Sequence, residues 1–155
     1  MIGSVINFVK LPWLLILIWA VMRFSLGVFF NVPYAPRGNA MFSLVGLTII
    51  SSIYFGALSN KVGGFDWKGT VLTGVFIALF AQVLIFLLSI LSLAAGLENS
   101  YFLHWDALNL TDGQSITMGS LLSLRLVGII VNSILGGIAA SLGRALAGFA
   151  PAAKA

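Results

Sequence analysis

The chain has 155 residues, of which 60% are hydrophobic and 8% are charged, and it carries a formal net charge of +4. With a mean hydropathy of +1.10, this composition excludes an ordinary soluble domain, in which about a quarter of the residues are charged. The absence of cysteine excludes disulfides, thiolate metal sites and cysteine nucleophiles, and the scattered Lys and Arg residues form no basic stripe for nucleic acid. We therefore expect one membrane domain, residues 1–155, whose main partner is the lipid bilayer.

The first apolar stretch covers residues 11–30 and is long enough to cross a bilayer as a helix. Pro12 suits the first turn of a helix, and Lys10 and Trp13 mark the membrane interface. An apolar run behind a basic residue is also typical of a secretory signal. This stretch is too long for a usual signal core, contains Arg23 and lacks a small-residue cleavage site. We therefore interpret it as an uncleaved anchor.

The second and third apolar stretches cover residues 41–60 and 71–96. Residues 31–39 separate the second stretch from the first, because the two prolines and the glycine of this connection cannot continue a helix. Gly63 and Gly64 turn the chain between the second and third stretches. The third stretch is the most apolar of the chain, and we expect it to be a membrane span.

The longest connection, residues 97–117, precedes a fourth apolar stretch at residues 118–147. It combines acidic residues, the single histidine and several aromatic side chains. This mixture is typical of a segment that lies on the surface of the membrane, on its outer side. Glu98, His104 and Asp106 match no recognised spacing of metal ligands, so we expect neither a metal site nor a cofactor. The fourth stretch is longer than a bilayer requires, and is expected to tilt or to project beyond the lipid.

Basic residues fall mainly on one side of the membrane if the four stretches cross it in turn. Since Lys and Arg in short loops resist translocation, this side is cytoplasmic and holds both termini. The sequence therefore predicts an all-α integral membrane four-helix bundle of up-down topology, multi-pass, in the cytoplasmic membrane of a bacterium. The basic residues of the cytoplasmic side are Lys10, Lys61, Lys68, Arg144 and Lys154, and the opposite loops offer only Arg37.

Small residues recur at helical spacing along one face of the fourth stretch, and the second stretch has a matching face. Helices in lipid associate through close packing of such residues and through interhelical hydrogen bonds. The faces serve either packing within the bundle or an interface with other membrane subunits or a second copy, and both interpretations stay open. The candidate packing positions are Gly56, Gly128, Gly136, Ala140 and Gly143.

Arg23 and Arg125 lie at similar depths, because residue 23 precedes residue 30 by seven positions and residue 125 follows residue 118 by seven. At 1.5 Å per residue, both Cα atoms should lie roughly 10 Å below the outer boundary. Two like charges in a low dielectric need an anion nearby or must reach water. The guanidiniums could extend to water, pair with Glu98, Asp106 or Asp112, or bind an anionic ligand such as a lipid phosphate. A carboxylate of a partner protein is the remaining alternative.

Tyr54, Gln82 and Asn132 are candidate polar contacts inside the bundle. Tyr54 and Asn132 should lie at a similar height, roughly 20 Å from the outer face. A water-accessible cavity around the three would support an intramembrane enzyme, and one interhelical hydrogen bond would account for them equally well. Since the sequence has no known catalytic motif, we expect no catalytic residues and no enzymatic activity.

The sequence favours a non-enzymatic integral membrane protein that is an accessory or assembly subunit, or a small oligomeric membrane protein. The alternative is a carrier or passive pathway for an anionic or amphiphilic small molecule or lipid, organised around Arg23 and Arg125. Acidic residues are absent from the four stretches, which disfavours a transporter coupled to protons or sodium ions.

Overall fold

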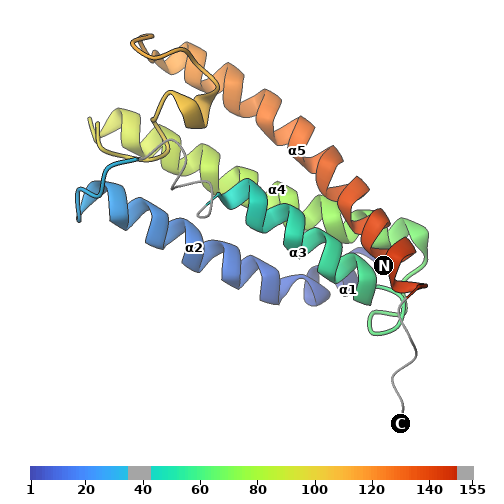
Figure 1. Ribbon diagram of the computed structural model, residues 1–155. Coiled ribbons are helices and arrows are strands. Elements are labelled where there is room, and N and C mark those ends of the chain that lie inside the picture. The colour runs from blue at the N-terminus through green and yellow to red at the C-terminus, as the bar shows by residue number, and fades with distance from the viewer. Residues whose placement is uncertain (35–42, 150–155) are drawn as a thin grey trace.

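The computed structural model describes residues 1–34 and 43–149, and within these ranges the chain forms helices and no strands. The prediction of an all-helical chain is confirmed for this part of the protein. Figure 1 shows α2, α3 and α4 running side by side, with α5 crossing over α3 and α4. The elements are α1 (Ile2–Phe8), α2 (Lys10–Val28), α3 (Leu44–Leu58), α4 (Trp67–Ala94), the 3₁₀ helix η2 (Asp106–Leu108) and α5 (Met118–Ala147).

Among the described residues, three helices are long and apolar enough to cross a membrane, namely α2, α4 and α5. Four spans were expected, but α3 has only 15 residues, or roughly 22 Å of helix against a hydrocarbon core of about 30 Å. It begins after Ser43, whose Oγ accepts a hydrogen bond from Gly46 N at 3.2 Å. Near its other end, the Ser59 hydroxyl donates to the Gly56 carbonyl at 2.7 Å. Residues 41 and 42 of the expected stretch lie outside the described residues.

The N-terminal helix α1 was not expected from the sequence. It is separated from α2 at Val9, which has φ −91° and ψ 4°. Pro12 accounts for the break, because a proline has no N–H to donate to the carbonyl of the residue four positions earlier, Phe8. Val5 and Val9 are fully buried, and the Phe8 ring makes an edge contact with Phe55 at a centroid distance of 5.5 Å. The short helix α1 therefore closes the end of the bundle opposite residues 97–117.

Helix α4 begins four residues before the expected stretch. The Asp66 carboxylate caps it by accepting a hydrogen bond from Gly69 N at 2.8 Å, and Gly96, with φ +64°, follows its C-terminal end. Helix α5 covers the residues expected of the fourth stretch. The side chains of Thr117 and Ser120 form a capping box at its start.

Glycines allow α5 to pack against both α3 and α4 at its C-terminal half. A Cβ atom added at Gly56 would overlap the backbone of Ala140, one added at Gly74 would overlap the carbonyl of Gly136, and one added at Gly143 would overlap the carbonyl of Ile53. The backbones therefore touch directly at these crossings, which is the close packing expected of helices in lipid. In contrast, Leu121 is the one buried residue in the N-terminal half of α5.

The two halves of α5 consequently differ in their distance from α3. In Figure 1 the N-terminal half, in orange, diverges from α3, whereas the C-terminal half, in red, crosses it. The large apolar side chains along the outer faces of α2 and α5 are exposed, as is consistent with contact with a lipid bilayer. Examples are Leu14, Ile18, Val21, Val127, Ile130, Ile134, Ile138 and Leu142.

Candidate functional site

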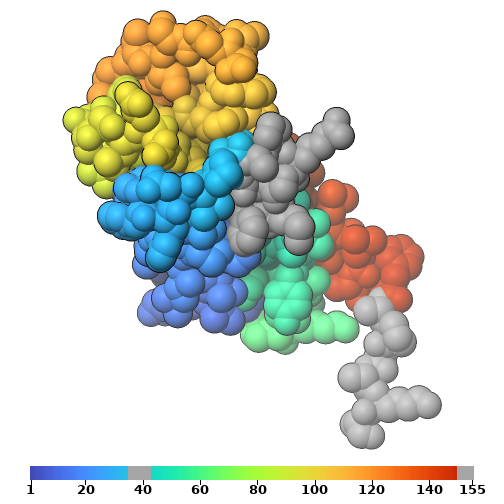
Figure 2. All heavy atoms as spheres, turned by 60° about the vertical axis from the view of Figure 1, so that its left-hand side comes forward, coloured from blue at the N-terminus to red at the C-terminus, as the bar shows by residue number. Residues whose placement is uncertain are grey.

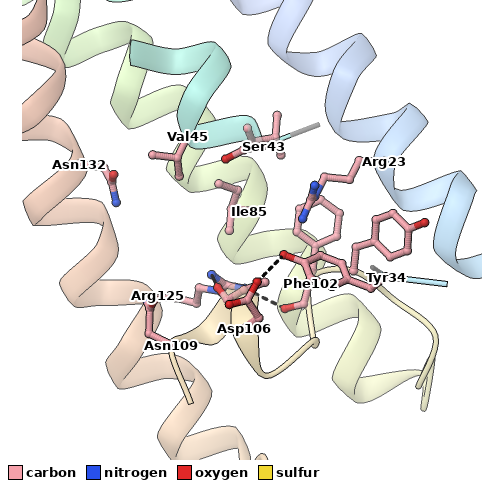
Figure 3. Close-up of a pocket in the computed structure, with 13 residues that line it drawn as sticks. Arg23, Tyr34, Ser43, Val45, Ile85, Phe102, Asp106, Asn109, Arg125 and Asn132 are labelled. Carbon is pink, nitrogen blue, oxygen red and sulfur yellow. Dashed lines mark hydrogen bonds between the residues drawn. The ribbon is translucent and has the colours of Figure 1, made fainter. Parts of the chain in front are cut away.

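A cavity of about 440 Å³ lies where α5 diverges from the rest of the bundle. Figure 3 shows Arg23 entering it from α2 and Arg125 entering it from α5. The two arginines predicted at one level therefore line the same space. The other lining residues are Tyr34, Ser43, Leu44, Val45, Ile85, Tyr101, Phe102, Asp106, Ala107, Asn109 and Asn132.

Arg23 is 6% exposed and lies against two aromatic rings. The guanidinium carbon is 5.5 Å from the centroid of Tyr34 and 5.4 Å from that of Tyr101, which are cation–π distances. The Tyr101 hydroxyl donates to the Val32 carbonyl at 2.8 Å. Burial raises the pKa of Tyr101, an effect that the charge of Arg23 opposes. Tyr101 therefore stays a neutral hydrogen-bond donor at physiological pH.

The end of α2 is joined to residues 97–117 beside this arginine. Asn99 Nδ2 donates to Asn31 Oδ1 at 2.8 Å, and Gly27 packs directly against the Asn99 carbonyl and the Tyr101 ring. Figure 2 shows residues 29–34, in light blue, lying against the yellow and orange surface of residues 97–117. These contacts hold the aromatic partners of Arg23 in place.

Arg125 binds three acceptors from two different parts of the chain. Its Nε donates to Ser89 Oγ at 2.9 Å, its Nη2 to the Phe102 carbonyl at 2.8 Å and its Nη1 to the Ala107 carbonyl at 3.2 Å. The guanidinium thus ties α5 to α4 and to residues 97–117. Among the described residues these partners are all electrically neutral. The guanidinium of Arg125 therefore contacts residues 97–117, the outer segment, through backbone carbonyls and not through the carboxylates of Glu98, Asp106 or Asp112.

Asp106 contributes a carboxylate to the cavity. Its Oδ2 accepts a hydrogen bond from the Tyr34 hydroxyl at 3.3 Å, and its backbone N–H donates to His104 Nδ1 at 3.3 Å. The rings of Tyr34 and His104 are stacked, with centroids 3.9 Å apart. No group of three His, Asp or Glu side chains in the described part of the chain is arranged to hold a metal ion.

No family model, curated protein or solved structure matches this chain.

Gln82 and Asn132 lie together beside Gly128, between α4 and α5. Asn132 Nδ2 donates to the Gly128 carbonyl at 2.9 Å, and a Cβ atom added at Gly128 would lie 3.4 Å from Gln82 Oε1. Gly128 therefore makes room for a polar side chain, whereas the other four candidate packing residues lie at the helix crossings. Asn132 also lines the deep end of the cavity.

The structure does not bring Tyr54 to this pair. Its side chain is 60% exposed on the outer surface of α3. At 3.6 residues per turn, a residue two positions from Ser52 and Gly56 points away from the face they share. Since Ser52 and Gly56 are buried, Tyr54 faces outward.

Sequence reasoning missed the aromatic partners of Arg23. The available signal was the position of Tyr34 and Tyr101 just outside two spans, on the side toward which Arg23 lies. It also used Arg144 only as one of the basic residues that mark the cytoplasmic side. In the structure Arg144 Nη1 donates to the Phe65 carbonyl at 2.9 Å and to Thr70 Oγ1 at 2.8 Å, and its guanidinium lies 4.6 Å from the centroid of Trp67.

The environment of His104 predicts a loss of stability in acid. Burial lowers the pKa of His104 below its ordinary value of 6.5, an effect that Asp106 and Asp112 oppose and Arg23 reinforces. A folded-state pKa below the unfolded value means that the contribution to stability is present above pH 6.5 and is lost as the pH falls through the lowered pKa. Between pH 7.5 and pH 5 the melting temperature of the wild type should fall further than that of His104→Gln, which does not titrate. An equal decrease in the melting temperatures of the two proteins would contradict this interpretation of His104, the only histidine in the sequence.

Proposed function

We propose that this chain is a multi-pass membrane protein with four spans, both termini in the cytoplasm and, as the host membrane, the cytoplasmic membrane of a bacterium. The apolar outer faces of α2, α4 and α5 support three of these spans. As the fourth, α3 packs against both α4 and α5, and local thinning of the bilayer accommodates its short length. The basic residues around the turn between α3 and α4 support a cytoplasmic location for that turn.

We further propose that the protein is not an enzyme, and that it binds the anionic head of an amphiphile or lipid in the cavity between Arg23 and Arg125. The observation that carries this proposal is the set of neutral partners around Arg125. A guanidinium has five N–H donors, and three of those of Arg125 are used by protein acceptors. Within the part of the chain that the structure describes, no protein acceptor takes the other two donors and no carboxylate pairs with the charge, and Arg125 lines a cavity large enough to admit a ligand.

The shape of the cavity supports an amphiphile over a small inorganic anion. Its outer part is lined by charged and hydrogen-bonding side chains, and its deeper part by the apolar Leu44, Val45 and Ile85 together with the amide of Asn132. Asn132 lies seven residues, or roughly 10 Å along α5, below Arg125. A polar head at the level of the arginines therefore leaves room for apolar chains toward the middle of the membrane.

Native mass spectrometry of the protein released from mild detergent tests this proposal. The wild type is expected to retain one bound phospholipid, and the double variant Arg23→Gln with Arg125→Gln to lose it. Lys61→Gln with Lys68→Gln removes two exposed charges at the other end of the bundle and should retain the lipid as the wild type does. Circular dichroism establishes whether each variant is folded. If the double glutamine variant is not folded, Arg23→Lys alone keeps both positive charges and the three hydrogen bonds of Arg125, and it should retain the lipid; loss of the lipid from this variant would contradict the proposal. A folded double glutamine variant that retains the lipid would contradict the proposal.

A second candidate function is an accessory or assembly subunit, or a small oligomer. It is favoured by a shallow apolar groove of about 590 Å³ between α4 and α5, lined by Trp67, Val71, Val75, Ile134, Gly137, Ile138, Ser141 and Leu142. A groove whose lining includes the small residues Gly137 and Ser141 admits a helix of another subunit or a second copy at close range. The same spectra would then show a dimer or a copurified protein in place of a bound lipid.

A further inference from the structure

The cavity contains a carboxylate as well as two guanidiniums. Asp106 lines it together with Arg23 and Arg125, and its Oδ2 accepts a hydrogen bond from the Tyr34 hydroxyl. Among the described residues no other donor binds the carboxylate of Asp106. A ligand with only negative charge would therefore bring its phosphate close to a carboxylate that has spare acceptor capacity.

The three charges have different local requirements. Arg23 already lies against two tyrosine rings, which disperse part of its charge. Arg125 has neutral partners and donors to spare, so it requires an anion. Asp106 is exposed at the mouth of the cavity and has room for a cation. A ligand that carries one anionic and one cationic group satisfies both Arg125 and Asp106.

We propose that the ligand is an ethanolamine phospholipid, with its phosphodiester bound by Arg125 beside Arg23 and its primary ammonium bound by Asp106. This inference rests on the proposed function. The order of the groups along the membrane normal supports it. Asp106 belongs to the outer segment, Arg125 lies one to two turns inside α5, and the apolar lining lies deeper still. A phospholipid in the outer leaflet presents ammonium, phosphate and acyl chains in that order.

The aromatic residues of the cavity favour a primary ammonium over a quaternary one. Quaternary ammonium groups are recognised by the faces of aromatic rings. The Tyr34 ring already contacts Arg23 and stacks on His104, and the Tyr101 ring contacts Arg23 and is 1% exposed. A primary ammonium instead donates hydrogen bonds, and a carboxylate is its strongest acceptor.

Competition among three phospholipids with identical acyl chains tests the inference, with binding measured by native mass spectrometry. The wild type is expected to bind the ethanolamine lipid about tenfold more tightly than the choline lipid, the effect of one charge-assisted hydrogen bond. Choline has the same charges but no N–H donor. The ethanolamine lipid should also bind more tightly than the glycerol lipid, which carries the phosphodiester alone.

Asp106→Asn should abolish the preference for ethanolamine over choline, and Asp106→Glu should retain part of it. Asp112→Asn removes a carboxylate from the same segment outside the cavity and should leave the preference unchanged. Binding of water-soluble glycerophosphoethanolamine, which lacks the acyl chains, is measured in the same way. If it binds as tightly as the intact lipid, the ligand is a free solute, and the lipid assignment is overturned.

The outcomes separate the two proposals. Equal binding of the ethanolamine and choline lipids, tighter binding of the glycerol lipid, or an unchanged preference in Asp106→Asn would overturn the zwitterionic ligand while leaving the cavity as an anion site. If the wild type retains none of the three lipids, or if Arg125→Gln binds all of them as the wild type does, the proposed function itself fails.

Discussion

Gly56→Ala is expected to destabilise the protein by about 3 kcal/mol, although alanine is a better helix former than glycine. The added methyl group would overlap the carbonyl oxygen, the carbonyl carbon and the Cα atom of Ala140. These are backbone atoms within α5, so no side-chain rotation relieves the overlap, and the two helices must move apart. The separation would also loosen the neighbouring contacts of Gly143 and Gly74. The measurement is the melting temperature, or the unfolding free energy in SDS titration from mild detergent.

Gly46→Ala provides the matched control in the same helix. A Cβ atom at Gly46 has Ser43 Cβ as its nearest neighbour, at 3.6 Å, which is an ordinary contact distance. This substitution should therefore leave stability unchanged or raise it by up to about 1 kcal/mol through helix propensity. If the two alanine variants have the same melting temperature, the crossing of α3 and α5 is not as close as the structure places it.

The same crossing determines where the cavity lies. Because α5 is fixed by its C-terminal half at Gly136, Ala140 and Gly143, its tilt carries the N-terminal half away from α3. The space that opens contains Arg125. Its side chain crosses this space and donates hydrogen bonds to α4 and to the outer segment. The close helix crossings and the cavity therefore belong to different halves of one helix.

The sequence predicts those features that follow from periodicity and local capping. The long apolar runs of α2, α4 and α5 identify them as helices because length and composition suffice. Helix α1 was missed because seven residues give too short a pattern, and its boundary depends on the missing N–H of Pro12. Depth estimates gave Tyr54 and Asn132 a similar height, but depth does not determine which face of its helix a residue occupies. The spacing of Tyr54 from Ser52 and Gly56 contained that information.

The candidate site could be predicted only in part. The depths of Arg23 and Arg125 indicated that they share a level, because rise per residue is fixed in a helix. Their partners depend on the path of residues 97–117, which has little regular structure. Backbone carbonyls carry no sequence signature, so the acceptors of Arg125 at Phe102 and Ala107 could not be read from residue types.

Arg125→Lys is expected to release residues 97–117 from the bundle even though it retains the positive charge. The guanidinium reaches Ser89, Phe102 and Ala107 through three different nitrogen atoms. A lysine presents all its donors at one nitrogen and cannot span these acceptors. At least one carbonyl would lose its partner, at a cost of about 2 kcal/mol to the closed state of the segment. Backbone amides in residues 97–117 should then exchange with deuterium roughly 30-fold faster, since a local opening equilibrium sets their protection.

Arg144→Lys is the control that separates geometry from charge. Both hydrogen bonds of Arg144, to the Phe65 carbonyl and to Thr70 Oγ1, come from the single atom Nη1. One ammonium nitrogen can make both, and it can also keep the cation–π contact with Trp67. Exchange near residues 65–70 should therefore change little in Arg144→Lys. If the two lysine variants instead behave alike, the charge of Arg125 holds the outer segment, and its three separate hydrogen bonds do not. Any cation at this position would then keep the cavity closed on its outer side.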